Sequence, residues 1–77
     1  MEKNFNEILG NELRIRRIKK GYSLEYVARC MNVSKMSVSY WETGKRAMYA
    51  TTFMKYCKIL GCPAQDVFIS VDKELSA

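Results

Sequence analysis

The chain has 77 residues, 48% of them hydrophobic, and its 13 Lys and Arg outnumber 8 Asp and Glu to give a net charge of +5. This length fits one small domain, and the hydrophobic content argues against disorder. No apolar run approaches the ~18 residues of a membrane span, and the start lacks the basic-then-apolar order of a signal peptide. We therefore expect a cytoplasmic protein without a membrane partner.

The side chains on which enzymes and metal sites commonly depend are scarce. The sequence has no His, no paired-carboxylate pattern and no glycine-rich phosphate loop. Cys30, Cys57 and Cys62 are an odd number without a CxxC pair, which favours reduced, partly buried thiols over a zinc site. We predict no enzymatic activity and no catalytic residue, cofactor, metal or small-molecule substrate.

The positive charge is concentrated in one part of the chain. Residues 14–46 hold nine basic residues against two acidic ones, a net of +7, whereas residues 1–13 carry −2 and residues 47–77 are neutral. An ordinary solvated surface is one explanation. The other is a basic face that attracts a polyanionic backbone such as that of DNA.

Periodicity predicts a first helix over about residues 6–19. Leu9, Leu13 and Arg17 fall at i, i+4 and i+8, and Gly21 suits a left-handed cap. An Arg in an otherwise apolar stripe needs a partner, because a buried unpaired charge is unfavourable. The remaining cations of this segment are expected in solvent or near phosphate: Arg14, Arg16, Lys19 and Lys20.

The pattern of residues 24–42 predicts two short helices joined by a tight turn. Ser23 and Ser34 are good N-caps, and Asn32 accepts the left-handed conformation that ends a helix. So short a joint requires a sharp crossing of two packed helices, which is the helix-turn-helix arrangement. The inward faces consist of Val27, Ala28 and Met31 in the first helix and of Val38 and Trp41 in the second.

A turn with two cations follows at residues 43–46, and a fourth helix is predicted over residues 50–60. Pro63 suits the beginning of a short fifth helix, which we expect to end near Phe68. Residues 69–77 fit either a tail or a strand, so the chain divides into a domain over residues 1–70 and a C-terminal tail over residues 71–77. The side chains expected to be buried here are Phe53, Met54, Cys57, Leu60, Val67 and Phe68.

Taken together, these segments resemble the phage repressor and Cro family, also called the XRE-type helix-turn-helix family. The resemblance covers about residues 8–68. It departs from the usual pattern at Leu24, where the family commonly has a phosphate-binding Gln, and at Asn32, where it commonly has Gly. The matching residues are Leu13-Arg14, Arg17, Gly21, Ala28, Asn32-Val33-Ser34, Val38-Ser39, Trp41-Glu42, Gly44-Lys45 and Leu60-Gly61.

The resemblance implies an all-α, compact five-helix bundle of the lambda-repressor-like kind, with a salt bridge between Arg17 and Glu42. It also implies that the third helix lies in the major groove of DNA. The implied base-reading residues are Lys35, Met36 and Tyr40, with Ser37 and Ser39 in reach. The implied phosphate-binding residues are Ser23, Leu24 (through its backbone), Ser34, Thr43, Lys45 and Arg46.

The predicted function is a sequence-specific, double-stranded DNA-binding transcriptional regulator, a repressor or controller protein that reads the major groove with helix 34–42. We expect a homodimer through residues 62–71 on a palindromic operator. No linked effector domain is expected, so switching would come through dimerisation, another protein or proteolysis. The alternative is a protein-interaction module, an antitoxin or anti-repressor with the same fold. The apolar Leu24, Met36 and Tyr40 favour that alternative.

Overall fold

The computed structural model describes residues 4–77, which form the expected five α-helices and contain no strand. The first three residues, part of the segment examined for a signal peptide, lie outside this description. No helix in the described part combines the length and the apolar character needed to cross a bilayer. The helices are α1 (Phe5–Lys19), α2 (Leu24–Met31), α3 (Lys35–Thr43), α4 (Ala50–Leu60) and α5 (Ala64–Ser76).

The predicted caps of the helix-turn-helix are present. The Oγ atom of Ser23 accepts a hydrogen bond from the amide of Tyr26 at 3.0 Å, and Ser34 Oγ accepts one from the amide of Ser37 at 3.1 Å. Asn32 ends α2 in the left-handed conformation, with φ at 56°. Two favourable N-caps and one left-handed C-cap therefore define the short joint between α2 and α3.

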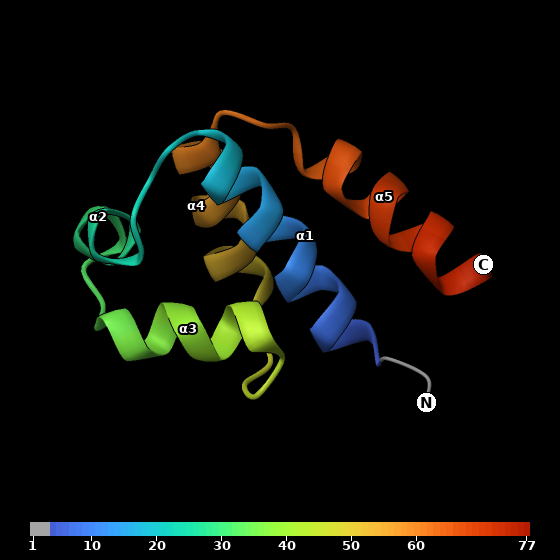
Figure 1. Cartoon of the computed structure of the whole chain (residues 1–77), viewed down its shortest axis with the longest axis horizontal. Coiled ribbons are helices and arrows are strands. Elements are labelled where there is room, and N and C mark those ends of the chain that lie inside the picture. The colour runs from blue at the N-terminus through green and yellow to red at the C-terminus, as the bar shows by residue number, and fades with distance from the viewer. Residues whose placement is uncertain (1–3) are drawn as a thin grey trace.

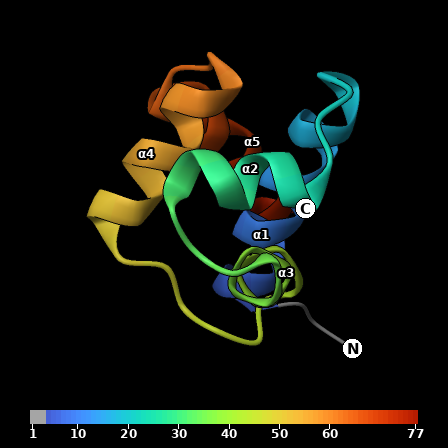
Figure 2. The same ribbon diagram turned by 90° about the vertical axis from the view of Figure 1, so that its left-hand side faces the viewer.

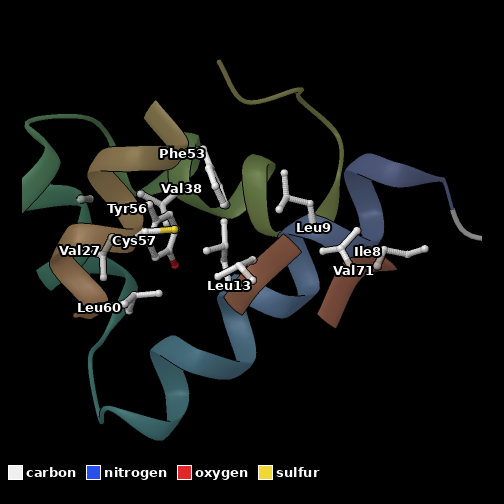
Figure 3. Packing of buried hydrophobic residues seen from close by; sticks show 12 residues of the cluster. Ile8, Leu9, Leu13, Val27, Val38, Phe53, Tyr56, Cys57, Leu60 and Val71 are labelled. Carbon is white, nitrogen blue, oxygen red and sulfur yellow. The ribbon is translucent and has the colours of Figure 1, made fainter. Parts of the chain in front are cut away.

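The five helices pack around one core, to which α1 and α4 contribute the central residues. Helix α1 contacts α3, α4 and α5, and α2 packs on α3 and α4. In Figure 3, side chains from α1, α3 and α4 point toward one another in this core. The fully buried side chains are Leu13, Val27, Val38, Tyr56, Leu60, Val67 and Val71.

The position of α3 sets the surface that the fold presents. Figure 1 shows α3 along one edge of the bundle, with α2 beside its N-terminal end and α5 on the far side of α1. Figure 2 looks down α3 and shows the loop that leads from its C-terminus to α4. One side of α3 faces the core, and the other is free of neighbouring helices.

Burial in α4 differs from the prediction at Met54 and at Tyr56. Met54 was expected in the core, but its side chain is 58% exposed. The core-facing stripe instead runs through Phe53, Tyr56, Cys57 and Leu60 at i, i+3, i+4 and i+7. Met54 lies off that stripe, and the phenol of Tyr56 occupies the inward position.

Helix α5 is longer than predicted. It continues past Phe68 to Ser76, so most of the expected tail is helical, and Val71 is buried four residues after the buried Val67. Residues 69–76, for which a tail or a strand was expected, are thus part of a helix. Phe68 was expected to face inward but is 48% exposed, and its ring lies against that of the buried Phe53 in a tilted arrangement, with centroids 4.8 Å apart.

The three cysteines are free thiols in different environments. Cys57 is buried and Cys62 half-buried, as expected of partly buried thiols, whereas Cys30 is exposed on α2. Burial, together with the neighbouring Cys62, raises the pKa of the Cys57 thiol to about 12. Cys57 therefore stays protonated at neutral pH and behaves as a small apolar core residue.

Candidate nucleic-acid interface

The N-terminal half of α3 presents two side chains to solvent. Lys35 is exposed, and Met36 is 61% exposed although it is apolar. On the opposite side of the helix, Val38 is fully buried and Trp41 packs against the core. The inward Val38 and Trp41 hold the helix to the bundle, while Lys35 and Met36 point away from it.

Helix α3 is held close to α1 by a glycine in the middle of α1. A Cβ atom built on Gly10 would lie 2.2 Å from the carbonyl oxygen of Trp41 and 2.7 Å from that of Glu42. No side chain fits in this space, so the two backbones touch at the crossing. The spacing between α1 and the last turn of α3 therefore depends on Gly10.

The buried ion pair implied by the resemblance is present at the same crossing. Arg17 Nε donates to Glu42 Oε2 at 2.7 Å and Arg17 Nη2 donates to Glu42 Oε1 at 3.1 Å. The two residues are only 8% and 5% exposed. A third donor, the hydroxyl of Tyr56, also bonds Glu42 Oε2, and Arg17 Nη1 donates to the carbonyl of Tyr22 at 2.8 Å.

Electrostatics at this site favour a charged Arg17 and a protonated Tyr56. The hydrogen bond to Glu42 raises the pKa of Arg17 against the opposing effect of burial. Burial, and then the hydrogen bond to Glu42, raise the pKa of Tyr56 well above its usual value. All three side chains are consequently used in joining α1, α3 and α4, and none of them is free to contact a ligand.

The predicted phosphate-binding residues lie at the ends of the two central helices. Ser23 and Ser34 are exposed caps, and Leu24 occupies the first turn of α2, where backbone N–H groups have no intrahelical partner. The side chain of Leu24 packs against the core. Thr43 Oγ1 donates to the carbonyl of Ser39 at 2.9 Å, so this hydroxyl has its proton committed within α3.

Several of these residues share one open groove between α1, α2 and α3. Ser39, a predicted base-reading residue, lines this groove. Its neighbours in the groove include four polar residues of α1 and the first residue of α2, so this concavity connects the α3 surface with the α2 N-terminus. The groove is lined by Glu7, Asn11, Arg14, Arg17, Leu24, Ser39, Glu42 and Thr43.

The remaining predicted site residues form a cluster at the end of α3. The guanidinium carbon of Arg46 lies 5.2 Å from the centroid of the Tyr40 ring, and Lys45 Nζ lies 5.8 Å from it. Arg46 Nη1 also donates to Ser37 Oγ at 3.3 Å. Of the predicted base readers, Tyr40 thus lies against both cations of the following turn, and Ser37 contacts Arg46.

The basic residues of segment 14–46 are divided between two roles. Arg17 is buried in its ion pair, and Arg16, expected in solvent or near phosphate, instead joins α1 to α5 by donating to Ser70 Oγ at 3.0 Å. Lys35, Lys45 and Arg46 remain exposed around α3. Part of the positive charge therefore holds the fold together, and part forms the surface of α3.

Sequence reasoning missed two residues that position this surface, Gly10 and Tyr56. A glycine inside a helix is unfavourable by roughly 1 kcal/mol relative to alanine, which signals a close approach. Tyr56 falls three residues after Phe53 and four before Leu60, the spacing of a buried helix face. Both signals were available in the sequence, but neither identifies the partner that the residue contacts.

Fold and site together define a DNA-binding transcriptional regulator with a helix-turn-helix. The chain belongs to the helix-turn-helix family HTH_3, the XRE type, whose family model matches residues 13–67. No curated protein matches the chain in sequence.

Solved structures with the same fold include proteins that regulate genes. The clp gene regulator ClgR from Corynebacterium glutamicum is 30% identical, with 94% of each chain covered and a TM-score of 0.88. The DNA-binding domain of BldD from S. venezulae is 25% identical, covering 84% of this chain and 97% of that one at a TM-score of 0.74. The restriction-modification controller protein C.AhdI from Aeromonas hydrophila is 24% identical, covering 79% and 92% at 0.75, and shares the fold.

Proposed function

We propose that this regulator binds double-stranded DNA sequence-specifically, as a repressor or controller protein, with α3 in the major groove. The observation that carries the proposal is the two-sidedness of α3. Val38 is fully buried, while Lys35 and the apolar Met36 are exposed at the N-terminal end of the helix. Recognition helices of helix-turn-helix proteins contact base edges with these N-terminal residues.

The exposed side chains have the chemistry that base reading requires. Lys35 is able to donate to O6 or N7 of guanine, and Met36 offers an apolar surface for the methyl group of thymine. Lys35 Nζ lies 3.7 Å from Glu25 Oε1 in the free protein, and both side chains are largely exposed. Such an exposed ion pair contributes little to stability, so Lys35 loses little free energy when it exchanges Glu25 for a guanine edge.

Contacts to the DNA backbone are proposed at the helix caps and at the turn after α3. The hydroxyls of Ser23 and Ser34 and the amide of Leu24 lie at helix N-termini, which favour anions. Lys45 and Arg46 supply charge, and Thr43 lies in the groove beside α1. These contacts set affinity and register rather than sequence preference.

We also propose a homodimer through residues 62–71, of which residues 64–71 lie on α5. Phe68 and Ile69 support this because each is about half exposed on α5, away from α3. A single module of this size covers a limited DNA surface, and symmetric dimers bind half-sites about one helical turn apart.

Selection of bound duplexes from a random DNA pool tests the function. We expect a preferred site with two related half-sites, and an affinity that falls steeply with salt because phosphate contacts release counterions. A pool that shows no preference, with binding that salt does not weaken, contradicts the proposal. It would favour the alternative of a protein-interaction module.

Lys35→Ala is expected to weaken binding to the selected site by ~1–3 kcal/mol and to relax the preference at one base pair. The reason is that the variant loses the donor to the base edge while the rest of the fold is untouched. Fluorescence anisotropy with the selected duplex and its single-base variants measures both effects.

Glu25→Gln serves as the matched control for this variant. It breaks the pair between Lys35 and Glu25 but keeps the ammonium group and removes a negative charge near the DNA. Affinity equal to or above that of the wild type is expected. An unchanged base preference in Lys35→Ala would show that Lys35 does not read sequence.

A further inference from the structure

Tyr40 lies on the side of α3 opposite the core, and two cationic side chains contact its ring. The cationic groups of Arg46 and Lys45 lie 5.2 and 5.8 Å from the ring centroid. Both distances fall within the ~6 Å over which a cation is attracted to an aromatic face. A ring face that is covered by a cation is not free to pack on a base.

The backbone of Tyr40 holds the same two residues. Its carbonyl oxygen accepts hydrogen bonds from the amide of Lys45 at 3.0 Å and from the amide of Arg46 at 3.2 Å. Gly44, in the left-handed conformation at φ 78°, turns the chain back so that both amides reach this carbonyl. Tyr40 thus contacts both the main chain and the side chains of the turn.

Ser37 makes a second contact with the side chain of Arg46. Arg46 Nη1 donates to Ser37 Oγ at 3.3 Å, and Ser37 Oγ also lies 2.9 Å from the hydroxyl of Ser34, the α3 cap. Because Ser37 precedes Tyr40 by three residues, the hydroxyl and the ring lie on adjacent turns of one helix face. Arg46 extends along that face and touches both.

We propose that Tyr40 and Ser37 are positioning residues, which hold Lys45 and Arg46 as a preformed clamp for the DNA backbone. This inference rests on the proposed function and deepens it. Tyr40 and Ser37 then position the cations that bind phosphate and do not read bases. Base reading is then left to Lys35 and Met36, with Ser39 in reach.

The physical advantage of such a clamp is preorganisation. Long cationic side chains lose rotamer freedom when they bind a phosphate, and that loss weakens binding by about two- to ten-fold for each side chain. A ring and a hydroxyl that already restrict Arg46 and Lys45 reduce the loss before DNA arrives. The gain is independent of DNA sequence, because phosphates are the same at every site.

The test compares Tyr40→Leu with Tyr40→Phe on two duplexes, the selected site and an unrelated one. Tyr40→Leu is expected to weaken binding to both by the same factor, about five- to ten-fold, because the ring face is lost. Tyr40→Phe keeps the ring and is expected to rescue that loss. Circular dichroism melting checks that both variants fold.

A double-mutant cycle identifies the cations as the route of the effect. In a background in which Lys45 and Arg46 are both replaced by Ala, Tyr40→Leu is expected to have no further effect on affinity. An undiminished effect in that background would overturn the inference. So would a change of preferred base in Tyr40→Phe, since that result would make the hydroxyl a base reader.

A readout without DNA separates this inference from the proposed function. In the wild type, the ring current of Tyr40 is expected to shift the side-chain proton resonances of Arg46 upfield, and Tyr40→Leu is expected to abolish the shift. Absence of that shift in the wild type overturns the clamp. A wild type that shows the shift but binds no duplex refutes the proposed function instead.

Discussion

Glu42→Ala is expected to destabilise the fold by about 3–5 kcal/mol, the range measured when one partner of a buried ion pair is removed. The variant leaves the guanidinium of Arg17, which is 8% exposed, without its anion, and it removes the acceptor of the Tyr56 hydroxyl. Small domains are stable by only about 5–15 kcal/mol, so much of the stability is lost. Denaturation by urea measures the free energy of unfolding.

Two variants serve as controls for Glu42→Ala. Tyr56→Phe removes one hydrogen bond to Glu42 but keeps the ion pair and the ring, so a smaller loss of about 1–2 kcal/mol is expected. Glu25→Gln removes a carboxylate from an exposed pair and is expected to leave stability within about 0.5 kcal/mol. A Glu42→Ala protein that melts at the temperature of the wild type would contradict the structural role of the pair.

Gly10→Ala is the second variant with a large expected effect. Helix propensity and packing predict opposite signs for its change in folding stability. Helix propensity alone predicts a gain of roughly 1 kcal/mol, because alanine is the better helix former. Packing predicts a loss, because the added Cβ would lie 2.2 Å from the carbonyl oxygen of Trp41. The obstacle is backbone, which cannot rotate away, so we expect a net destabilisation of about 3 kcal/mol or more.

The same variant links stability to DNA binding. Separating α1 from α3 at Gly10 also displaces the last turn of α3, which carries Glu42 and leads to Lys45 and Arg46. Affinity is expected to fall even at temperatures where the variant remains folded. Denaturation and anisotropy with the selected duplex measure the two effects.

Gly21→Ala is the matched glycine control. A Cβ atom there meets nothing within 4 Å, although the residue has φ at +77°. The expected loss is therefore only the ~1–2 kcal/mol of a left-handed residue with a side chain, without a change in DNA binding. A Gly10→Ala protein more stable than the wild type would mean that α1 and α3 do not approach as closely as the crossing indicates.

Sequence reasoning was most accurate where the cause of structure is local. The bounds predicted for α4 agree with those observed, and Ser23, Ser34 and Asn32 cap their helices as expected. A cap depends on a side chain and an amide two or three residues away, so its signal lies within one short window. The end of α5 was missed because residues 69–77 fitted either a tail or a strand, and the helical spacing of Val67 and Val71 was not recognised.

The site was only partly accessible by the same means. Burial of Met54 and Phe68 was expected from their hydrophobicity, yet both are about half exposed because their helices turn other faces inward. The role of Arg16 in joining α1 to α5 depends on Ser70, 54 residues later. Sequence pattern identifies an apolar stripe, but it does not state which neighbouring helix lies against that stripe.

The sequence by itself determined the five helices, the capped turn between α2 and α3, and the family to which the chain belongs. Three contacts are known only from the folded structure. Gly10 of α1 touches the last turn of α3, and the hydroxyl of Tyr56 bonds Glu42 beside Arg17. The ring of Tyr40 lies against Lys45 and Arg46 of the following turn. The physical reason is the distance along the chain over which each interaction acts. Caps and periodicity act within a few residues, whereas close approach, burial and charge pairing depend on helices that meet only when the chain is folded.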